Sequence, residues 1–175
     1  MRKLKLYIAA SLDGYIAGTN GEIDWLDVDG DEDYGYQEFC ASIDTTLMGN
    51  STYQLTLTVD KLPDSNMTNY VFTKDSPPPD TDYVNSVTGD IGGFVRTLKQ
   101  QAGKDVWLVG YGQINTVMLK EGLIDEIILT ASPLVRGEGI SRFCTGRHAP
   151  QFQNRELPSL QYGSCSVAPG EKIGI

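Results

Sequence analysis

The sequence predicts an α/β fold whose sheet is parallel in its middle and antiparallel at its carboxyl-terminal end. Strand-like segments alternate with helix-like segments through most of the chain, and strands alone follow. Residues 105–109 (Asp-Val-Trp-Leu-Val) form an apolar run that is typical of a strand buried on both faces of a parallel sheet. Neither an internal repeat nor a long linker is visible, so we expect residues 1–175 to form one domain.

The first half of the chain contains three expected strands and two expected helices. They are strands at 4–10, 15–17 and 45–48, a short helix within 34–41, and a helix that begins at Asn50 or Ser51. The turn Asp13-Gly14 ends the first strand, and Gly49 ends the third. Asn and Ser are both good helix caps, so either residue can begin the second helix. The acidic stretch 27–33 is expected to be a loop.

The second half contains further alternating elements. They are strands at 69–73, 83–87, 105–109 and 124–132, helices after Asp90 and Gly112, and a less regular, antiparallel tail over 152–167. Asp90 is a suitable cap for a helix with Ile91, Phe94, Val95 and Leu98 on its apolar face. Ile114, Val117 and Met118 are expected on one face of the next helix.

The charge of the chain excludes some classes of partner. Its formal net charge is −9, and no Lys or Arg occurs between Lys5 and Lys61. Nucleic acids and anionic membranes both attract clustered bases, so we expect neither as a partner. A phosphate-bearing ligand must then be held by backbone amides or by bases after residue 60.

The cysteine and histidine counts favour a reduced cytoplasmic protein without a metal site. The chain has three cysteines, an odd number without a Cys-x-x-Cys pair, and its one histidine is His148. No secretory signal and no apolar run of about 20 residues is visible. We therefore expect cytoplasmic localisation and an ordinary structural role for His148.

Two strand–glycine–helix junctions are candidate phosphate sites. Val109-Gly-Tyr-Gly-Gln-Ile-Asn follows the apolar strand, and Met48-Gly-Asn-Ser-Thr-Tyr follows an earlier one. Glycine lets the backbone approach a ligand, and the amides at a helix start attract anions. Asn115 occupies the position where the dinucleotide fingerprint has its third glycine. The first junction can therefore also be interpreted as an ordinary tight turn. The second also reads as a simple helix cap.

Two further segments carry charged candidates at expected strand ends. Lys74 follows the strand 69–73, where ligands of α/β sheets gather, and the alternative is a solvated surface lysine. Glu138 lies between two glycines after the strand 124–132. A carboxylate there can bind an amine or move a proton, and the alternative is a polar surface turn.

The acidic segment 27–38 resembles a calcium loop only in part. Acids occupy its first, third, fifth and twelfth positions, but Glu32 stands where the loop needs glycine. Residues 18–26 are irregular, so the preceding helix is absent as well. A solvated acidic loop is the better interpretation, and calcium remains a minor alternative.

Five motifs in order resemble the dihydrofolate-reductase-like superfamily. They are Ile8-Ala-Ala-Ser-Leu-Asp-Gly-Tyr-Ile-Ala, Ile43-Asp-Thr-Thr-Leu-Met-Gly-Asn-Ser-Thr-Tyr, Tyr70-Val-Phe-Thr-Lys, Val106-Trp-Leu-Val-Gly-Tyr-Gly, and Gly122-Leu-Ile-Asp-Glu with Gly137-Glu-Gly-Ile. The chain is most similar to stand-alone relatives of the reductase domain of the bifunctional riboflavin-biosynthesis deaminase–reductase. The similarity spans about residues 3–143. It implies a three-layer fold with a mixed, mostly parallel central sheet and helices on both faces, and a homodimer.

The resemblance also implies an NADPH site and a substrate site. The implied cofactor-binding residues are Ser11, Gly49, Asn50, Ser51, Thr52, Thr73, Lys74, Gly110, Tyr111, Gly112 and Gln113. Asp13 and Glu138 are the implied catalytic residues, with Gly14 bordering nicotinamide and substrate. Asn50 stands where the family usually has arginine, and Tyr111 interrupts its glycine triplet. The phosphates would then rely on helix-end amides, Ser51, Thr52 and Lys74.

The leading functional hypothesis is hydride transfer from NADPH to a small polar substrate. The family implies a ribosylamino-pyrimidine phosphate, whose phosphate Arg136, Arg142 or Arg147 would bind. Dihydrofolate reduction is an alternative, although Ile23-Asp-Trp-Leu-Asp lacks the proline usual in that branch. A non-catalytic nucleotide-binding module is a second alternative.

Overall fold

The computed structural model describes residues 1–26, 35–58, 64–74, 77 and 79–144. The main sheet has the strand order β5-β4-β3-β6-β1-β7, and every adjacent pair is parallel. The strands are β1 (Leu4–Ser11), β3 (Ile43–Gly49), β4 (Thr68–Phe72), β5 (Val84–Val87), β6 (Asp105–Val109) and β7 (Glu126–Ser132). Two short antiparallel strands, β2 (Tyr15–Ala17) and β8 (Ile140–Ser141), form a separate sheet.

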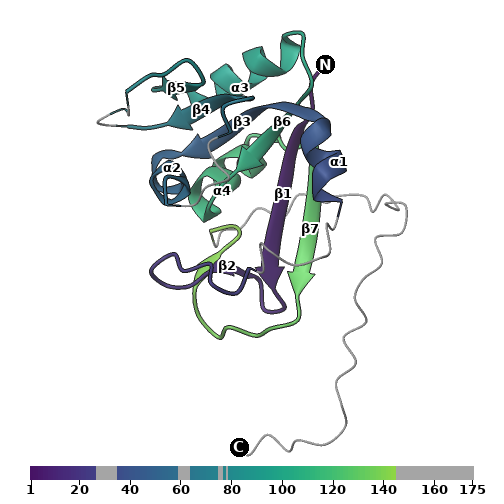
Figure 1. Cartoon of the computed structure of the whole chain (residues 1–175), viewed down its shortest axis with the longest axis vertical. Coiled ribbons are helices and arrows are strands. Elements are labelled where there is room, and N and C mark those ends of the chain that lie inside the picture. Colours follow the sequence, from purple (N-terminus) through teal and green to yellow (C-terminus); the bar gives the residue numbers. More distant parts are fainter. Residues whose placement is uncertain (27–34, 59–63, 75–76, 78, 145–175) are drawn as a thin grey trace, which may run out of the picture.

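Helices cover both faces of the main sheet (Figure 1). They are α1 (Tyr36–Ala41), α2 (Asn50–Thr56), α3 (Ile91–Gln100) and α4 (Gly112–Lys120). The faces follow from alternation along the strands, because successive side chains point to opposite sides. Leu47 packs with the α3 and α4 cluster, whereas its neighbour Met48 packs with Tyr53 of α2.

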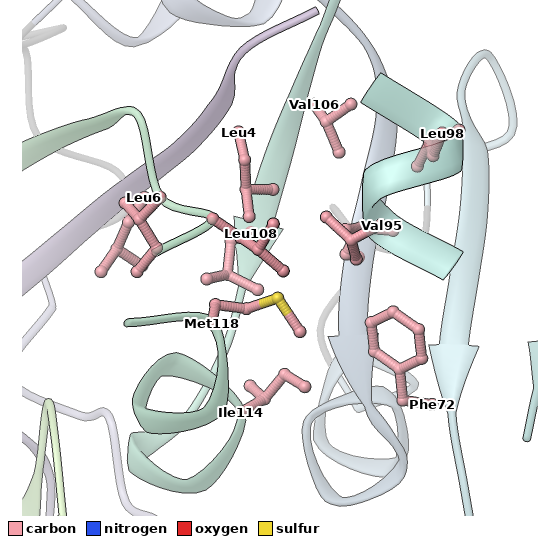
Figure 2. Packing of buried hydrophobic residues seen from close by; sticks show 12 residues of the cluster. Leu4, Leu6, Phe72, Val95, Leu98, Val106, Leu108, Ile114 and Met118 are labelled. Carbon is pink, nitrogen blue, oxygen red and sulfur yellow. The ribbon is translucent and has the colours of Figure 1, made fainter. Parts of the chain in front are cut away.

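The larger core lies between the sheet and the pair α3 and α4. Figure 2 shows Val95 and Leu98 of α3 and Ile114 and Met118 of α4 turned toward Leu108. The opposite face carries an aromatic cluster under α1, in which Phe39 meets Trp107 edge-on at 5.3 Å between ring centroids. Burial of these apolar side chains holds the helices on the sheet.

Most of the predicted elements are confirmed, and the α/β sheet with helices on both faces is present. Asp90 caps α3, since its carboxylate accepts a hydrogen bond from the Gly93 amide at 2.9 Å. The strand expected from residue 124 runs from Glu126 to Ser132 and is parallel to β1. The expected acidic loop, His148 and the antiparallel tail lie outside the described residues.

Three local expectations are wrong. α2 begins at Asn50 as expected, but neither Asn50 nor Ser51 is its cap, because the cap position is Gly49, which has no side chain to accept a hydrogen bond. Val117 is exposed, because the buried side of α4 runs through Ile114, Asn115 and Met118. The strand expected at residue 83 begins at Val84.

The register creates a step in the carboxyl edge of the sheet. Gly49 is level with Phe72, and Met48 is level with Val109, so β4, β3 and β6 end together. Lys5 pairs with Trp107, which places Tyr7 level with the end of β6. β1 continues to Ser11, about 13 Å farther at roughly 3.3 Å per residue. Figure 1 shows β1 and β7 extending past the starts of α2 and α4 toward β2.

Among the described residues, no helix has the length and apolarity that a membrane crossing needs.

Candidate functional site

The implied cofactor residues lie along this stepped carboxyl edge. Gly49 follows the end of β3, Thr73 follows β4, and Gly110 follows β6, on three adjacent strands. Ser11 ends the longer strand β1. Ligands of open α/β sheets bind beyond the carboxyl ends of the strands, so the fold brings these residues to one working edge.

The β3–α2 junction leaves room for a ligand to approach the backbone. A β-carbon at Gly49 would meet no atom within 4 Å, although its φ of −81° suits any residue. Ser51 is exposed, whereas Thr52 is buried at 7% exposure, so of the two only Ser51 presents its hydroxyl outward. The Asn50 Oδ1 atom is buried without a hydrogen-bond partner among the described residues. An orphaned buried acceptor beside open space is compatible with a bound polar group.

The β6–α4 junction is instead tightly packed. A β-carbon at Gly112 would lie 2.5 Å from the carbonyl oxygen of Ser141, so only glycine fits there. Tyr111 is half-buried, and its hydroxyl donates a 3.4 Å hydrogen bond to the Gly21 carbonyl. Burial raises the pKa of the Tyr111 phenol. Gln113 is exposed in the first turn of α4.

Asn115 fastens the β6–α4 junction to the segment after β7. Its side chain is fully buried, and its Nδ2 donates to the carbonyl oxygens of Gly110 at 2.9 Å and Arg142 at 3.1 Å. The residue that breaks the glycine fingerprint is thus a clamp between two loops. Sequence reasoning missed this role, because a polar residue in a helix gives no sign of its distant partner.

Asp13 holds the same segment from the other side. Its carboxylate accepts hydrogen bonds from the Ser11 hydroxyl at 2.6 Å and from the amides of Gly137 at 2.7 Å and Arg136 at 3.2 Å. The Ser11 bond, followed by the two amide bonds, lowers the pKa of Asp13 to about 2. Asp13 is therefore ionised at neutral pH and has no proton to donate. Ser11 is buried, with its hydroxyl engaged by Asp13 and by the Tyr15 amide.

The chain between the end of β7 and the residue after β8 presents two charged side chains of interest, Glu138 and Arg142. Glu138 is exposed and makes no hydrogen bond or ion pair with another described residue. The Arg142 guanidinium lies against Gly14, with Nη2 3.4 Å from the position of a β-carbon there. Arg136 instead reaches Gly18 beside the Glu22 carboxylate. The third candidate, Arg147, lies outside the described residues.

Thr73 and Lys74 form the outer part of the edge. The Thr73 amide donates to the Val87 carbonyl at 3.1 Å, and its side chain is buried. Lys74 is exposed and forms no ion pair with a described residue. No group of three or more His, Cys, Asp or Glu side chains capable of holding a metal occurs in the described part of the chain.

Comparison with known proteins identifies the family. The model of the RibD C-terminal domain matches residues 2–167, nearly the whole chain. The chain belongs to the RibD C-terminal domain family. This is a family of reductase domains, and the resemblance seen in the five motifs is confirmed.

Relatives of this RibD C-terminal domain include stand-alone proteins. YwjB of Bacillus subtilis is 39% identical over 144 residues, covering 81% of this chain and 83% of that protein. YyaP of the same organism is 33% identical over 150 residues, covering 79% of this chain and 78% of that protein. Both alignments span most of each chain, so this architecture occurs without an attached deaminase domain.

Solved structures agree with the fold. The RibD C-terminal domain chain superposes with a TM-score of 0.75 on a putative riboflavin biosynthesis protein from Shewanella sp. PV-4, at 28% identity and covering 86% and 88% of the two chains. A bifunctional deaminase/reductase from Thermotoga maritima gives a TM-score of 0.61 at 17% identity. That match covers 86% of this chain and 51% of the larger protein, and it supports the fold alone.

Proposed function

We propose that the protein is an NADPH-dependent reductase that transfers a hydride to a small polar substrate of the ribosylamino-pyrimidine phosphate type. The observation that carries the proposal is the aligned carboxyl edge of β4, β3 and β6, with open space beside Gly49. Membership in a family of reductase domains supports the same chemistry.

The residues of the edge fit an extended dinucleotide. Gly49, the exposed Ser51 and the backbone amides near them would hold the pyrophosphate, whereas the orphaned Asn50 Oδ1 can accept only from a donor such as a ribose hydroxyl. Lys74, free of ion pairs with described residues, would face the 2′-phosphate beside Thr73.

The nicotinamide end would lie beyond the β6–α4 junction, which consists of Gly110, Tyr111, Gly112 and Gln113. When bound, NADPH supplies the hydride, while the protein positions the substrate and excludes competing reactions. The extension of β1 and the segment held by Asp13 would form the wall against which the substrate rests.

The two carboxylates would have different tasks. Asp13 is ionised and bound to the amides of residues 136 and 137, so it positions that segment beside the substrate and does not donate a proton. Glu138 is exposed and unengaged by described residues, so it is the group that can orient the substrate or exchange a proton with it.

Cofactor binding and turnover test the proposal separately. NADPH and NADH are titrated against the wild type and Lys74→Ala while the melting temperature is followed. We expect NADPH to stabilise the wild type and Lys74→Ala to bind NADPH about tenfold more weakly, with NADH affinity unchanged. Oxidation of NADPH with the ribosylamino-pyrimidine phosphate then measures turnover. Failure of both cofactors to bind would overturn the proposal.

The main rival is a nucleotide-binding module without catalysis. The family departures at Asn50 and Tyr111 favour this rival over an ordinary reductase site. It predicts NADPH stabilisation with no substrate-dependent oxidation at high protein concentration. Turnover of dihydrofolate in place of the pyrimidine substrate would instead favour the folate branch.

We also propose a homodimer in the cytoplasm, as the family resemblance implies. β7 lies at the edge of the main sheet among the described strands. Leu129 on it and the loop residues Leu12 and Val135 are large exposed apolar residues. Sedimentation of the wild type and Leu129→Lys would test the association. A monomer at high concentration would contradict it.

A further inference from the structure

We propose that Arg142 is the residue that binds the phosphate group of the substrate, an assignment that rests on the proposed function. Arg136, Arg142 and Arg147 are the candidates by sequence, and the structure separates the two that it describes. The distinction comes from the carboxylate charge near each guanidinium.

Arg136 lies beside the Glu22 carboxylate without forming an ion pair or a hydrogen bond with it, and its Nε is buried without a partner among the described residues. A β-carbon at Gly18 would lie 2.8 Å from Arg136 Nη2 and 2.0 Å from Glu22 Oε2, so both groups approach one point. Hydrogen bonds from Asn20 and, with them, the charge of Arg136 lower the pKa of Glu22. The Arg136 amide also donates to Asp13. The Glu22 charge therefore partly offsets the charge of Arg136.

Arg142 has no such partner among the described residues. Its guanidinium forms no hydrogen bond there and has no carboxylate within ion-pair distance, although the side chain is half-buried. The neighbouring Asp13 carboxylate is occupied by Ser11 and two amides. A partly desolvated cation without a counter-ion is costly, so this position favours an anionic ligand.

The backbone beneath Arg142 is fixed on three sides. Its carbonyl oxygen accepts the Asn115 bond at 3.1 Å, Ser141 pairs with Tyr15, and the Ser141 carbonyl packs against Gly112. Gly14, with φ of 90°, leaves the space that the guanidinium occupies. Bidentate phosphate recognition requires a planar guanidinium with two donors side by side and a backbone that holds it in place.

The location suits a substrate rather than the cofactor. Gly14 follows β1, which extends about 13 Å past the ends of β3 and β6, where the cofactor would bind. Lys74 lies beyond β4, three positions away from β1 in the sheet order. The two bases are thus suited to two different phosphates.

The test is calorimetric titration with ribose 5-phosphate, with and without saturating NADPH. Uncharged ribose and inorganic phosphate separate the sugar and phosphate contributions. The variants are Arg142→Ala, Arg142→Gln and Arg142→Lys, with Arg136→Ala as the matched arginine control and Arg96→Ala as a distant surface control. Arg142→Gln removes the charge but keeps a longer, polar side chain if the alanine variant fails to fold.

We expect Arg142→Ala and Arg142→Gln to weaken ribose 5-phosphate binding by about tenfold or more. Arg142→Lys should lose less, because it keeps the charge without the fork, and Arg136→Ala should stay within about twofold. Equal binding by wild type and Arg142→Ala, a loss confined to Arg136→Ala, or no saturable binding by the wild type would overturn the assignment. The NADPH titration of Arg142→Ala should match the wild type. Absence of NADPH binding in every variant would instead count against the reductase proposal.

Discussion

The Asp13 carboxylate accepts a 2.7 Å hydrogen bond from the Gly137 amide, which joins the end of β1 to a segment 124 residues later. Together with the Asn115–Arg142 bond, it fastens the segment that runs from the end of β7 to Arg142, just after β8, at the carboxyl edge of the sheet. These two contacts determine where Glu138 and Arg142 are presented.

Substitution Asp13→Asn should lower stability in a pH-dependent way. The Ser11 hydrogen bond and the two amide bonds depress the pKa of Asp13 from its ordinary 3.8 to about 2. A depressed carboxyl pKa contributes stability that is complete above the unfolded value and is lost as pH falls through the folded value. The difference in unfolding free energy between wild type and Asp13→Asn should therefore be constant near neutrality and shrink between about pH 4 and pH 2.

Urea unfolding of both proteins across this range measures that difference. Glu138→Gln is a suitable control, because Glu138 makes no hydrogen bond with a described residue. A difference that is independent of pH would show that the Asp13 charge does not stabilise the segment.

The glycines at the two helix starts should respond oppositely to alanine. Gly49→Ala places a methyl in open space at φ −81°, so we expect it to cost less than about 1 kcal/mol while weakening NADPH binding. Gly112→Ala forces a methyl to 2.5 Å from the Ser141 carbonyl and should cost about 1–3 kcal/mol. Chemical denaturation and NADPH titration of both variants separate the effects. Unchanged NADPH affinity in Gly49→Ala would argue against the cofactor passing that glycine.

Removal of the Asn115 side chain should destabilise the protein more than removal of a typical polar side chain does. Asn115→Ala leaves the carbonyls of Gly110 and Arg142 without their donor, at an expected cost of about 2–3 kcal/mol. Asn115→Asp should be worse, because a buried carboxylate cannot donate to either carbonyl. The exposed Asn66 offers a matched control, for which Asn66→Ala should stay within about 0.5 kcal/mol. Equal unfolding free energies for Asn115→Ala and Asn66→Ala would refute the clamp.

Two arginines far from the site provide a test of burial. Arg2 contacts the Asp44 carboxylate and donates to the Thr45 hydroxyl and the Lys104 carbonyl, with its side chain 6% exposed. Arg96 pairs with Glu121 while both side chains are about half exposed. Arg2→Met should cost about 2 kcal/mol, less than a fully buried pair because Asp44 is 38% exposed, and Arg96→Met under about 1 kcal/mol. Thermal unfolding compares them, and a reversed order would contradict the burial argument.

The pKa of the Asp44 carboxyl provides a second measure of its interaction with Arg2. Burial opposes its ionisation, but hydrogen bonds from the Lys104 amide and the Thr45 hydroxyl, with the Arg2 charge, outweigh burial and lower its pKa. In Arg2→Met, loss of that charge should raise the Asp44 pKa toward its ordinary value, a shift that NMR titration of the carboxyl carbon would detect.

The sequence alone was sufficient to predict the alternation of strands and helices, the buried strand Asp105–Val109 and the Asp90 cap. These features depend on local periodicity, apolar content and capping chemistry, which are read within a few residues. The order of the five family motifs also predicted the family, which the comparison confirmed.

Only the tertiary structure decided which predicted site residues are available to a ligand. The Ser11 hydroxyl and the Asp13 carboxylate are already hydrogen-bonded within their own turn, and Asp13 also binds residues 136 and 137. Asn115, at the position of the fingerprint's third glycine, holds Arg142 through a hydrogen bond. Arg136 and Arg142 look alike in sequence, yet one lies beside Glu22 and the other lies against Gly14 without a described partner. Apart from the Ser11–Asp13 bond, these distinctions arise from contacts between residues 27 or more positions apart in the chain, and local sequence pattern carries no information about them.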